Sequence, residues 1–267
     1  MLNLEQKQQY ETKGYLLPFH GVSACESQKL LTNLNNVAES DVIAVKNPWY
    51  YKSYLLFTWL DKLVRNRNLL KPVEALLGKD ILCLSCDVWR KKARETRHIS
   101  WHQDASYWKF SPPKILTVWL SLTEASSRNG CMRFLPGSQK LGSLHHVKTF
   151  APDNILSHGQ SLQIKVDEAR TVCAELRPGQ FSIHHCLLAH ASGPNPTSHD
   201  RVGLCIRYAP GHLRQENGPP VSAMTVRGIA TGNLVSEKPP TKSLNALAID
   251  QHNRLLTPHA PTRYTHF

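Results

Sequence analysis

The sequence predicts a β-sandwich or small β-barrel core with α-helices packed on its outside. From Asp80 onward, short apolar runs alternate with turns built from proline and glycine, a texture typical of antiparallel strands. The preceding 79 residues instead carry apolar side chains at helical spacing. No self-similarity with a period of roughly 20 to 50 residues is present, so repeat architectures are excluded. A length of 267 residues suits one such domain spanning residues 1–267.

Residues 1–79 are expected to form several helices. Asn3 is a typical N-cap for a helix over 4–12 that Gly14 would end. Ser23 to Glu26 read as a capping box ahead of a helix that reaches residue 38. Two further helices are expected, over 54–66 and from Lys71-Pro72 to Gly78.

Residues 80–209 are expected to form the β core. The candidate strands, bounded by turn residues such as Pro136-Gly137 and Pro178-Gly179, are 81–88, 115–122, 131–135, 162–166, 171–176, 180–185 and 202–208. Residues 210–267 are rich in proline, glycine, serine and asparagine. This last segment is therefore expected to be irregular, with one short helix near 244–249.

Composition narrows the class of protein. Apolar residues make up 41%, as in an ordinary globular chain, and no run of 18 apolar residues predicts a membrane span. Lys and Arg exceed Asp and Glu by 32 − 20, a net charge of +12, which favours an anionic partner. The seven cysteines lack framework spacing and no secretory signal is visible, so reduced thiols and a cytoplasmic location are expected.

The first chemical signal is the run Trp101-His102-Gln103-Asp104. On an extended backbone, residues two apart point to the same face, so His102 and Asp104 would offer a nitrogen and an oxygen to one point. A second histidine from a distant strand would complete a two-histidine, one-carboxylate face, which suits Fe(II) in oxygen-activating enzymes. With 14 histidines in the chain, a surface turn pair is the alternative for this motif alone.

The second signal lies between residues 179 and 201. A Pro-Gly turn precedes a strand that leads to His190 and a Ser-Gly-Pro turn, and Arg201 follows 11 residues after His190. The arginine fork matches a carboxylate bidentately, so Arg201 could bind the far carboxylate of a 2-oxo acid that chelates iron. His184 or His185 are the alternatives to His190 as distal ligand, and Arg207 is the alternative to Arg201 should Arg201 prove exposed.

Taken in order, these motifs resemble the phytanoyl-CoA dioxygenase family of Fe(II)- and 2-oxoglutarate-dependent oxygenases. The matching segments are Trp101-His102-Gln103-Asp104, Asn129 to Arg133 running into Pro136-Gly137-Ser138, and His190 to Asn195 followed by Arg201. The resemblance covers about residues 80–208, and Gly14-Tyr15-Leu16 also fits. It implies a double-stranded β-helix (a jelly-roll, cupin-like core) with helices outside.

The resemblance also implies the site and its cofactors. His102, Asp104 and His190 would bind iron, Arg201 would bind the 5-carboxylate of 2-oxoglutarate, and dioxygen would be the second cosubstrate. It further places near 2-oxoglutarate the residues Gln103, Thr117, Trp119 and Ser192. Related halogenating enzymes carry a small residue in place of the carboxylate, so Asp104 favours oxygen transfer.

A small-molecule substrate is expected, with neither nucleic acid nor a membrane as partner. The candidate substrate-contacting residues are Tyr107, Trp108, Arg94, Arg97 and His98. The expected reaction is hydroxylation of an unactivated C–H bond in a polar or anionic metabolite, in natural-product tailoring or phosphonate metabolism. The alternatives are desaturation, epoxidation or ring closure on the same core, a nucleic-acid or protein demethylase, a metal-free jelly-roll module, and a zinc hydrolase.

Overall fold

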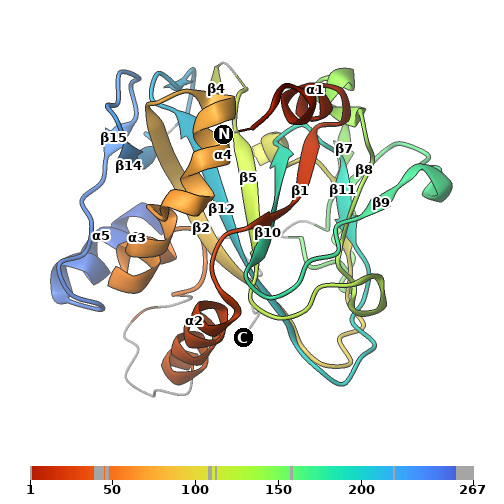
Figure 1. Cartoon of the computed structure of the whole chain (residues 1–267), viewed down its shortest axis with the longest axis horizontal. Coiled ribbons are helices and arrows are strands. Elements are labelled where there is room, and N and C mark those ends of the chain that lie inside the picture. Colours follow the sequence, from red (N-terminus) through yellow and green to blue (C-terminus); the bar gives the residue numbers. More distant parts are fainter. Residues whose placement is uncertain are drawn as a thin grey trace.

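Two β-sheets form the centre of the computed structural model, which describes residues 2–38, 45, 48–107, 110–111, 113–156, 159–218 and 220–256 (Figure 1). The larger sheet has the order β1-β10-β5-β12-β2-β14-β15, and the smaller has the order β3-β11-β6-β9. The strands of the larger sheet are β1 (Tyr15–His20), β2 (Ile81–Lys91), β5 (Leu116–Ser121), β10 (Gln180–His185), β12 (Arg201–Pro210), β14 (Ser222–Arg227) and β15 (Val235–Ser236). Those of the smaller sheet are β3 (Ile99–His102), β6 (Met132–Phe134), β9 (Val172–Cys173) and β11 (His190–Ser192).

The sheets make the jelly-roll core that the sequence predicts. All neighbouring strands in them are antiparallel except β14 and β15, which are parallel. Two small ribbons complete the described β structure, one pairing β4 (Phe110–Ser111) with β13 (Arg214–Gln215) and one pairing β7 (His146–Val147) with β8 (Ser161–Leu162). In the described part of the chain, the helices are too short or too polar to cross a lipid bilayer.

The helices lie outside the larger sheet (Figure 1). They are α1 (Leu4–Lys13), α2 (Ala24–Ala38), α3 (Thr58–Val64), α4 (Arg67–Leu77) and α5 (Ala246–Leu256). Asn3 caps α1 through a full capping box with Gln6, and Gly14 ends it at a φ of 81°, as the local sequence predicts. Buried residues of α2, α3 and α4 share one apolar cluster with the outer face of the larger sheet.

The predicted helix over 54–66 is wrong in its first half. Residues Ser53–Leu55 form a single 3-10 turn, and Phe57 is extended at φ −123° before α3 begins. The ring of Phe57 stacks on Trp49 at 5.0 Å, so packing of two buried aromatic rings overrides the local helical pattern. Helix α4 starts at Arg67, capped by Asn66, and contains Pro72 rather than opening at it.

Strands also form in both segments where none was expected, residues 1–79 and 210–267. Strand β1 falls in the part predicted to be helical and contains Pro18, which has no amide hydrogen to give to a ladder. It pairs with β10 alone, at the edge of the sheet, where proline is tolerated. Strand β14 falls in the segment expected to be irregular, yet it pairs with β2. The short helix predicted near 244–249 is observed as α5, which starts at Ala246 and runs further, to Leu256.

Alternation along the central strands separates a helix-covered face from an inner face. On β12, Val202, Leu204 and Ile206 point to the helices and join the main apolar cluster. The intervening Arg201, Cys205 and Arg207 line a pocket between the two sheets. Strand β5 follows the same rule, since its even-numbered residues join the main apolar cluster while Trp119 lines the pocket. The inner face of the larger sheet therefore carries the chemistry.

Candidate metal and cosubstrate site

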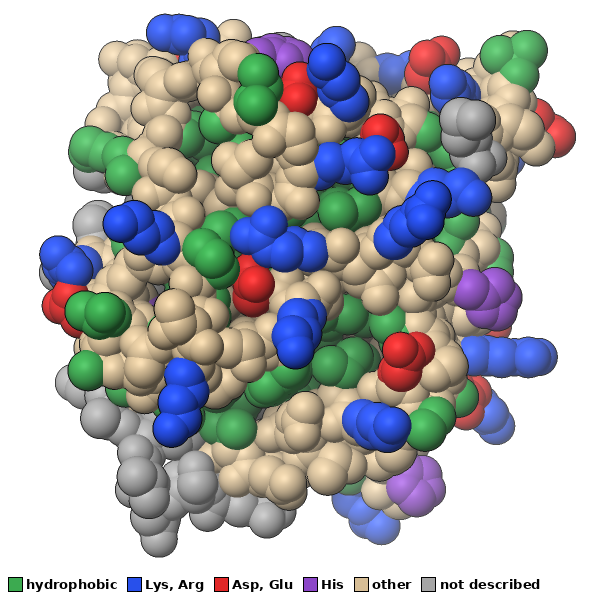
Figure 2. Space-filling model, turned by 60° about the vertical axis from the view of Figure 1, so that its left-hand side comes forward, with side chains coloured by type: hydrophobic (Ala, Val, Ile, Leu, Met, Phe, Trp, Pro, Cys, Tyr) green, Lys and Arg blue, Asp and Glu red, His purple; other side chains and the backbone are tan. Residues whose placement is uncertain are grey.

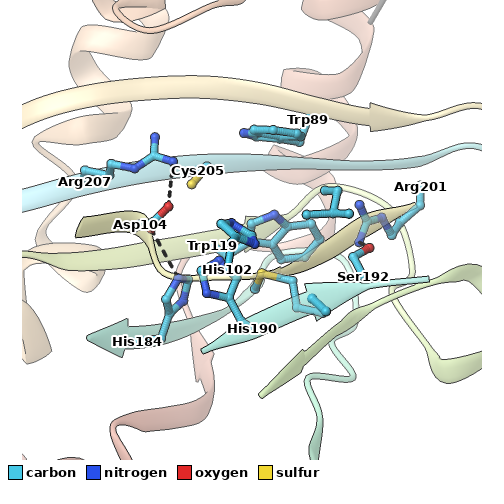
Figure 3. Close-up of a pocket in the computed structure, with 13 residues that line it drawn as sticks. Trp89, His102, Asp104, Trp119, His184, His190, Ser192, Arg201, Cys205 and Arg207 are labelled. Atoms are coloured by element: carbon cyan, nitrogen blue, oxygen red, sulfur yellow. Dashed lines mark hydrogen bonds and ion pairs between the residues drawn. The ribbon is translucent and has the colours of Figure 1, made fainter. Parts of the chain in front are cut away.

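One pocket of about 460 Å³, partly open to solvent, lies between the two sheets (Figure 3). Its floor and walls come from seven strands of the two sheets and from the turn after β3. The lining residues are Trp89, Ile99, His102, Asp104, Trp119, Met132, His184, His190, Ala191, Ser192, Arg201, Cys205 and Arg207. The pocket therefore gathers residues from two motifs that lie almost 90 positions apart.

Three side chains in this pocket could hold a metal ion. His102, Asp104 and His190 each offer one ligand atom, the three atoms lie within 4.8 Å of one another, and all three residues are buried. The two histidines are brought together by strand pairing, because His190 on β11 is the direct antiparallel partner of His102 on β3. Their ring centroids are 4.1 Å apart.

Backbone carbonyls set the orientation of both imidazole rings. His102 Nδ1 lies 2.9 Å from the Ser100 carbonyl oxygen, and His190 Nδ1 lies 3.0 Å from that of Leu188. A carbonyl only accepts, so each Nδ1 carries the proton and each Nε2 keeps its lone pair for a metal. Burial, with a contribution from neighbouring histidines, lowers the pKa of His102 to about 3 and that of His190 to about 4, which keeps both rings neutral.

Asp104 reaches the site by a different route from the one its spacing predicts. Strand β3 ends at His102, and Asp104 opens a 3-10 turn, so the two residues do not share one face of a single strand. Thr117 donates a hydrogen bond to Oδ2 at 2.7 Å, and Arg207 lies 3.3 Å from Oδ1. Burial alone would raise the pKa of this carboxyl, but Arg207 and the neighbouring histidines hold it well below its usual range. Asp104 is therefore an oriented carboxylate.

His184 and His185, the alternatives to His190, occupy different environments. His184 on β10 is buried and its Nε2 lies 3.6 Å from Asp104 Oδ2, so it contacts the carboxylate from below the site (Figure 3). His185 points to the other face, where its ring lies 6.2 Å from that of Tyr10 and its Nδ1 accepts the amide of Leu187. The three-residue cluster forms with His190.

Arg201 begins β12 and is only 2% exposed. Its Nη1 donates to the Gly130 carbonyl oxygen at 2.7 Å, and its guanidinium lies 5.3 Å from the centre of the Trp119 ring. Its Nε has no hydrogen-bond partner, and no carboxylate of the described residues lies within 4.0 Å of it. A buried cation without an acid fits a carboxylate ligand, since an uncompensated buried charge is costly.

Small residues make room for this cation. A Cβ on Gly203 would lie 2.3 Å from the Trp119 ring, so only glycine there lets the indole reach Arg201. Ser192 donates its hydroxyl hydrogen to Gly130 O at 2.7 Å and lies 3.4 Å from Arg201 Nη1. Trp119 and Ser192 thus line the pocket beside Arg201.

Gly130 should tolerate no side chain. Its φ is +70°, and a Cβ would lie 2.3 Å from Gly193 O and 2.4 Å from Pro194 O. We expect Gly130→Ala to cost clearly more unfolding free energy than Gly137→Ala, in which the backbone is also left-handed but the nearest atom to an added Cβ is Thr12 O at 3.5 Å, an ordinary contact. Left-handed backbone alone costs about 1–2 kcal/mol. Urea unfolding of both variants checks this, and equal losses would contradict it.

Gln103 and Thr117, which the resemblance places near 2-oxoglutarate, are absent from the residues that line the pocket. Gln103 is fully buried, donates to the carbonyls of Gly142 and Leu187, and accepts the amide of Leu144. Its amide group therefore holds loops together behind the metal cluster. Thr117 instead donates its hydrogen bond to the Asp104 carboxylate. His146 was missed by sequence reasoning; its Nε2 accepts the backbone amide of Gln103 at 3.0 Å, between the two ligands.

Of the five predicted substrate-contacting residues, the structure describes the side chains of three. Trp108 and the side chain of Tyr107 lie outside the described residues. Arg94 is exposed, Arg97 pairs with Glu95 at 2.6 Å, and His98 lies 3.6 Å from Asp153 Oδ2. None of these last three lines the pocket. Four other residues that line the pocket, Trp89, Ile99, Met132 and Cys205, were not among the candidate site residues named from the sequence.

Arg207, the predicted alternative to Arg201, already has acidic partners. It forms a close ion pair with Asp87 on β2 and a second contact with Asp104. It also donates to Ser85 Oγ at 3.1 Å. Arg207 therefore connects the larger sheet to the metal cluster through its ion pairs. Arg201, by contrast, is a buried guanidinium that forms no ion pair with any acidic side chain of the described residues.

The family of this chain follows from comparison with known proteins. The model of the phytanoyl-CoA dioxygenase (PhyH) family matches residues 10–203. The chain belongs to the phytanoyl-CoA dioxygenase family. It is an oxygenase that depends on Fe(II) and 2-oxoglutarate, in agreement with its buried His-Asp-His cluster. The donor set fits iron, and the acid-free Arg201 fits the carboxylate of the cosubstrate.

Individual relatives of this PhyH-family chain are similar over most of their length. The probable alpha-ketoglutarate-dependent hypophosphite dioxygenase of Stutzerimonas stutzeri is 26% identical over 224 residues, 77% of this chain and 78% of that protein. Peroxisomal phytanoyl-CoA dioxygenase of Homo sapiens is 25% identical over 235 residues, 78% of this chain and 69% of that protein. The structure of the non-heme monooxygenase ThoJ without ligand superposes with a TM-score of 0.85 at 28% identity over 95% of each chain.

Proposed function

We propose that this oxygenase hydroxylates an unactivated C–H bond of a small polar or anionic metabolite, in natural-product tailoring or phosphonate metabolism. The observation that carries the proposal is the presence, in one pocket, of a metal-binding cluster and of a buried arginine without an acid. Two relatives named for small polar substrates support the class, the probable hypophosphite dioxygenase and an L-proline trans-4-hydroxylase of Streptomyces griseoviridis, 25% identical over 55% of this chain.

The residues divide the work by position. His102, His190 and Asp104 would hold the iron, with Thr117 and Arg207 fixing the carboxylate. Arg201 would bind the 5-carboxylate of 2-oxoglutarate, with Trp119 and Ser192 beside it. When bound, iron, 2-oxoglutarate and dioxygen together supply the oxidation, which yields succinate, carbon dioxide and one oxygen atom for the substrate.

The apolar lining contributes by shielding and orienting the substrate. Trp89, Ile99 and Met132 lie on the pocket wall beside the metal cluster and offer no group that could compete for the metal through nitrogen or oxygen lone pairs. An indole, an isoleucine and a thioether exclude water and leave room for a C–H bond to approach. We therefore expect the reacting part of the substrate to be aliphatic, with its polar groups at the pocket mouth.

The basic excess of the chain does not form one stripe on the face in Figure 2. Lys and Arg side chains are spread there among apolar and acidic ones. This dispersion supports local attraction of a small anion more than docking of a long polyanion. A methylated nucleic acid or peptide is therefore the second class to test.

Succinate release triggered by candidate substrates tests the proposal. The panel contains phosphonates and hypophosphite, free amino acids, acyl-CoA thioesters, methylated oligonucleotides and methylated peptides. We expect a small polar or anionic compound to trigger oxygen-dependent succinate formation, with a product heavier by one oxygen atom. A product lighter by two hydrogens would replace hydroxylation by desaturation or ring closure. Triggering only by the thioesters or by the methylated polymers would overturn the proposed substrate class.

A further inference from the structure

A lysine side chain is buried next to Arg201 and contacts Ser192. Lys91 is the last residue of β2 and the direct antiparallel partner of Arg201 on β12. Its side chain is 1% exposed. The Nζ atom donates to Ser192 Oγ at 2.7 Å and to Ser192 O at 3.1 Å, and it contacts the carbonyl oxygen of Gly193 closely. The Ser192 hydroxyl is therefore shared between Lys91 and Arg201.

No carboxylate of the described residues lies within 4.0 Å of the Lys91 ammonium. The charged and titratable groups that act on it are Arg201 from β12, Glu95 from the segment after β2, and Cys131 from the segment before β6. Glu95 is already paired with Arg97 at 2.6 Å. Burial first and Arg201 second lower the pKa of Lys91 to about 6. At neutral pH the empty pocket therefore favours a neutral amine at this position.

We propose that Lys91 is a positioning residue for 2-oxoglutarate, which takes up one proton when a carboxylate binds at Arg201 and keeps Ser192 Oγ, the acceptor that it shares with Arg201, in place beside the guanidinium. The inference rests on the proposed role of Arg201. The proton comes from the buffer and forms an N–H bond with the lone pair of Nζ, so no other bond changes. An anion beside two cations removes the repulsion that disfavours the charged amine.

The proton uptake predicts how the affinity for 2-oxoglutarate changes with pH. Above the pKa of the empty pocket, binding must bring a proton to Lys91, so 2-oxoglutarate affinity falls as pH rises. The limit is about tenfold per pH unit for one proton. Lys91→Met removes the titrating group, so its affinity should be lower than wild type at pH 7 and nearly independent of pH from 7 to 9. Turnover at saturating 2-oxoglutarate should change far less than KM.

Calorimetry counts the proton directly. Titrating 2-oxoglutarate into the Mn(II)-loaded protein at pH 8, in two buffers with different ionisation enthalpies, should give an uptake approaching one proton for wild type. Lys92→Met, which removes the exposed neighbouring charge, should match wild type, and Lys91→Met should show an uptake near zero. Absence of proton uptake by the wild-type protein would overturn the proposal, and this result can be obtained even if Lys91→Met does not fold. Full proton uptake by a folded Lys91→Met protein would also overturn it.

The same titrations separate this inference from the proposed cosubstrate site. If Arg201→Met keeps wild-type affinity for 2-oxoglutarate, the proposed site itself is wrong. If Arg201→Met loses affinity while Lys91→Met keeps both affinity and proton uptake, Arg201 retains its role and Lys91 is a structural support of the turn at Ser192 and Gly193. A loss of proton uptake in Lys91→Met alone supports the inference.

Discussion

Replacing Asp104 with alanine should abolish substrate-dependent succinate formation and weaken Fe(II) binding by more than the roughly 10- to 100-fold that loss of an outer partner of a metal ligand costs. The change removes the charged member of the His-Asp-His cluster and leaves two neutral imidazoles. It also leaves the Thr117 hydroxyl without its acceptor and Arg207 with Asp87 as its remaining ion-pair partner. Anaerobic metal titration and a coupled succinate assay measure the two effects.

The matched control is Asp153→Ala. The Asp153 side chain is 65% exposed and lies 3.6 Å from His98, and neither residue lines the pocket, so the variant removes one carboxylate without touching the pocket. It should bind metal and turn over as wild type does. Full activity of Asp104→Ala without added carboxylate, in protein whose unfolding midpoint is unchanged, would show that the iron is held elsewhere.

Replacing Arg201 with methionine should raise the KM for 2-oxoglutarate by roughly 30-fold or more, since truncating a buried charged partner costs about 2–5 kcal/mol. The metal cluster is separate from Arg201, so Fe(II) affinity should remain near that of wild type. Methionine is apolar and of similar length, and it replaces a side chain that is 2% exposed. Initial rates over a 2-oxoglutarate series, with separate metal titrations, give both quantities.

Two further variants sharpen this result. Arg201→Lys keeps the positive charge but loses the planar fork, so its KM should lie between those of wild type and Arg201→Met. Arg128→Met removes an arginine whose side chain is 82% exposed and should leave KM unchanged. An unchanged KM for 2-oxoglutarate in Arg201→Met would show that another cationic residue of the pocket binds the cosubstrate carboxylate.

The order of motifs predicts the family and the fold class because each motif uses local chemistry. Asn3 and Gly14 cap α1 with backbone groups only a few residues away. His102 and His190 are recognisable by what surrounds them along the chain. The route by which Asp104 enters the site was predicted incorrectly, since the strand gives way to a 3-10 turn after His102. A tripeptide pattern does not contain the hydrogen bond from Thr117, 13 positions away, that holds the carboxylate.

Residue types and their spacing, together with the family resemblance that they carry, predicted without any structure an iron oxygenase with a β core and named His102, Asp104 and His190 as its candidate ligands. Only the tertiary structure decided that Arg207 supports Asp104, that Gln103 braces loops, and that Lys91 lies against Arg201. These contacts join residues from 39 to 110 positions apart. The contacts of Arg207 and Lys91 depend on the register of β12 against β2, and a shift by one residue would turn these inner side chains toward the helices.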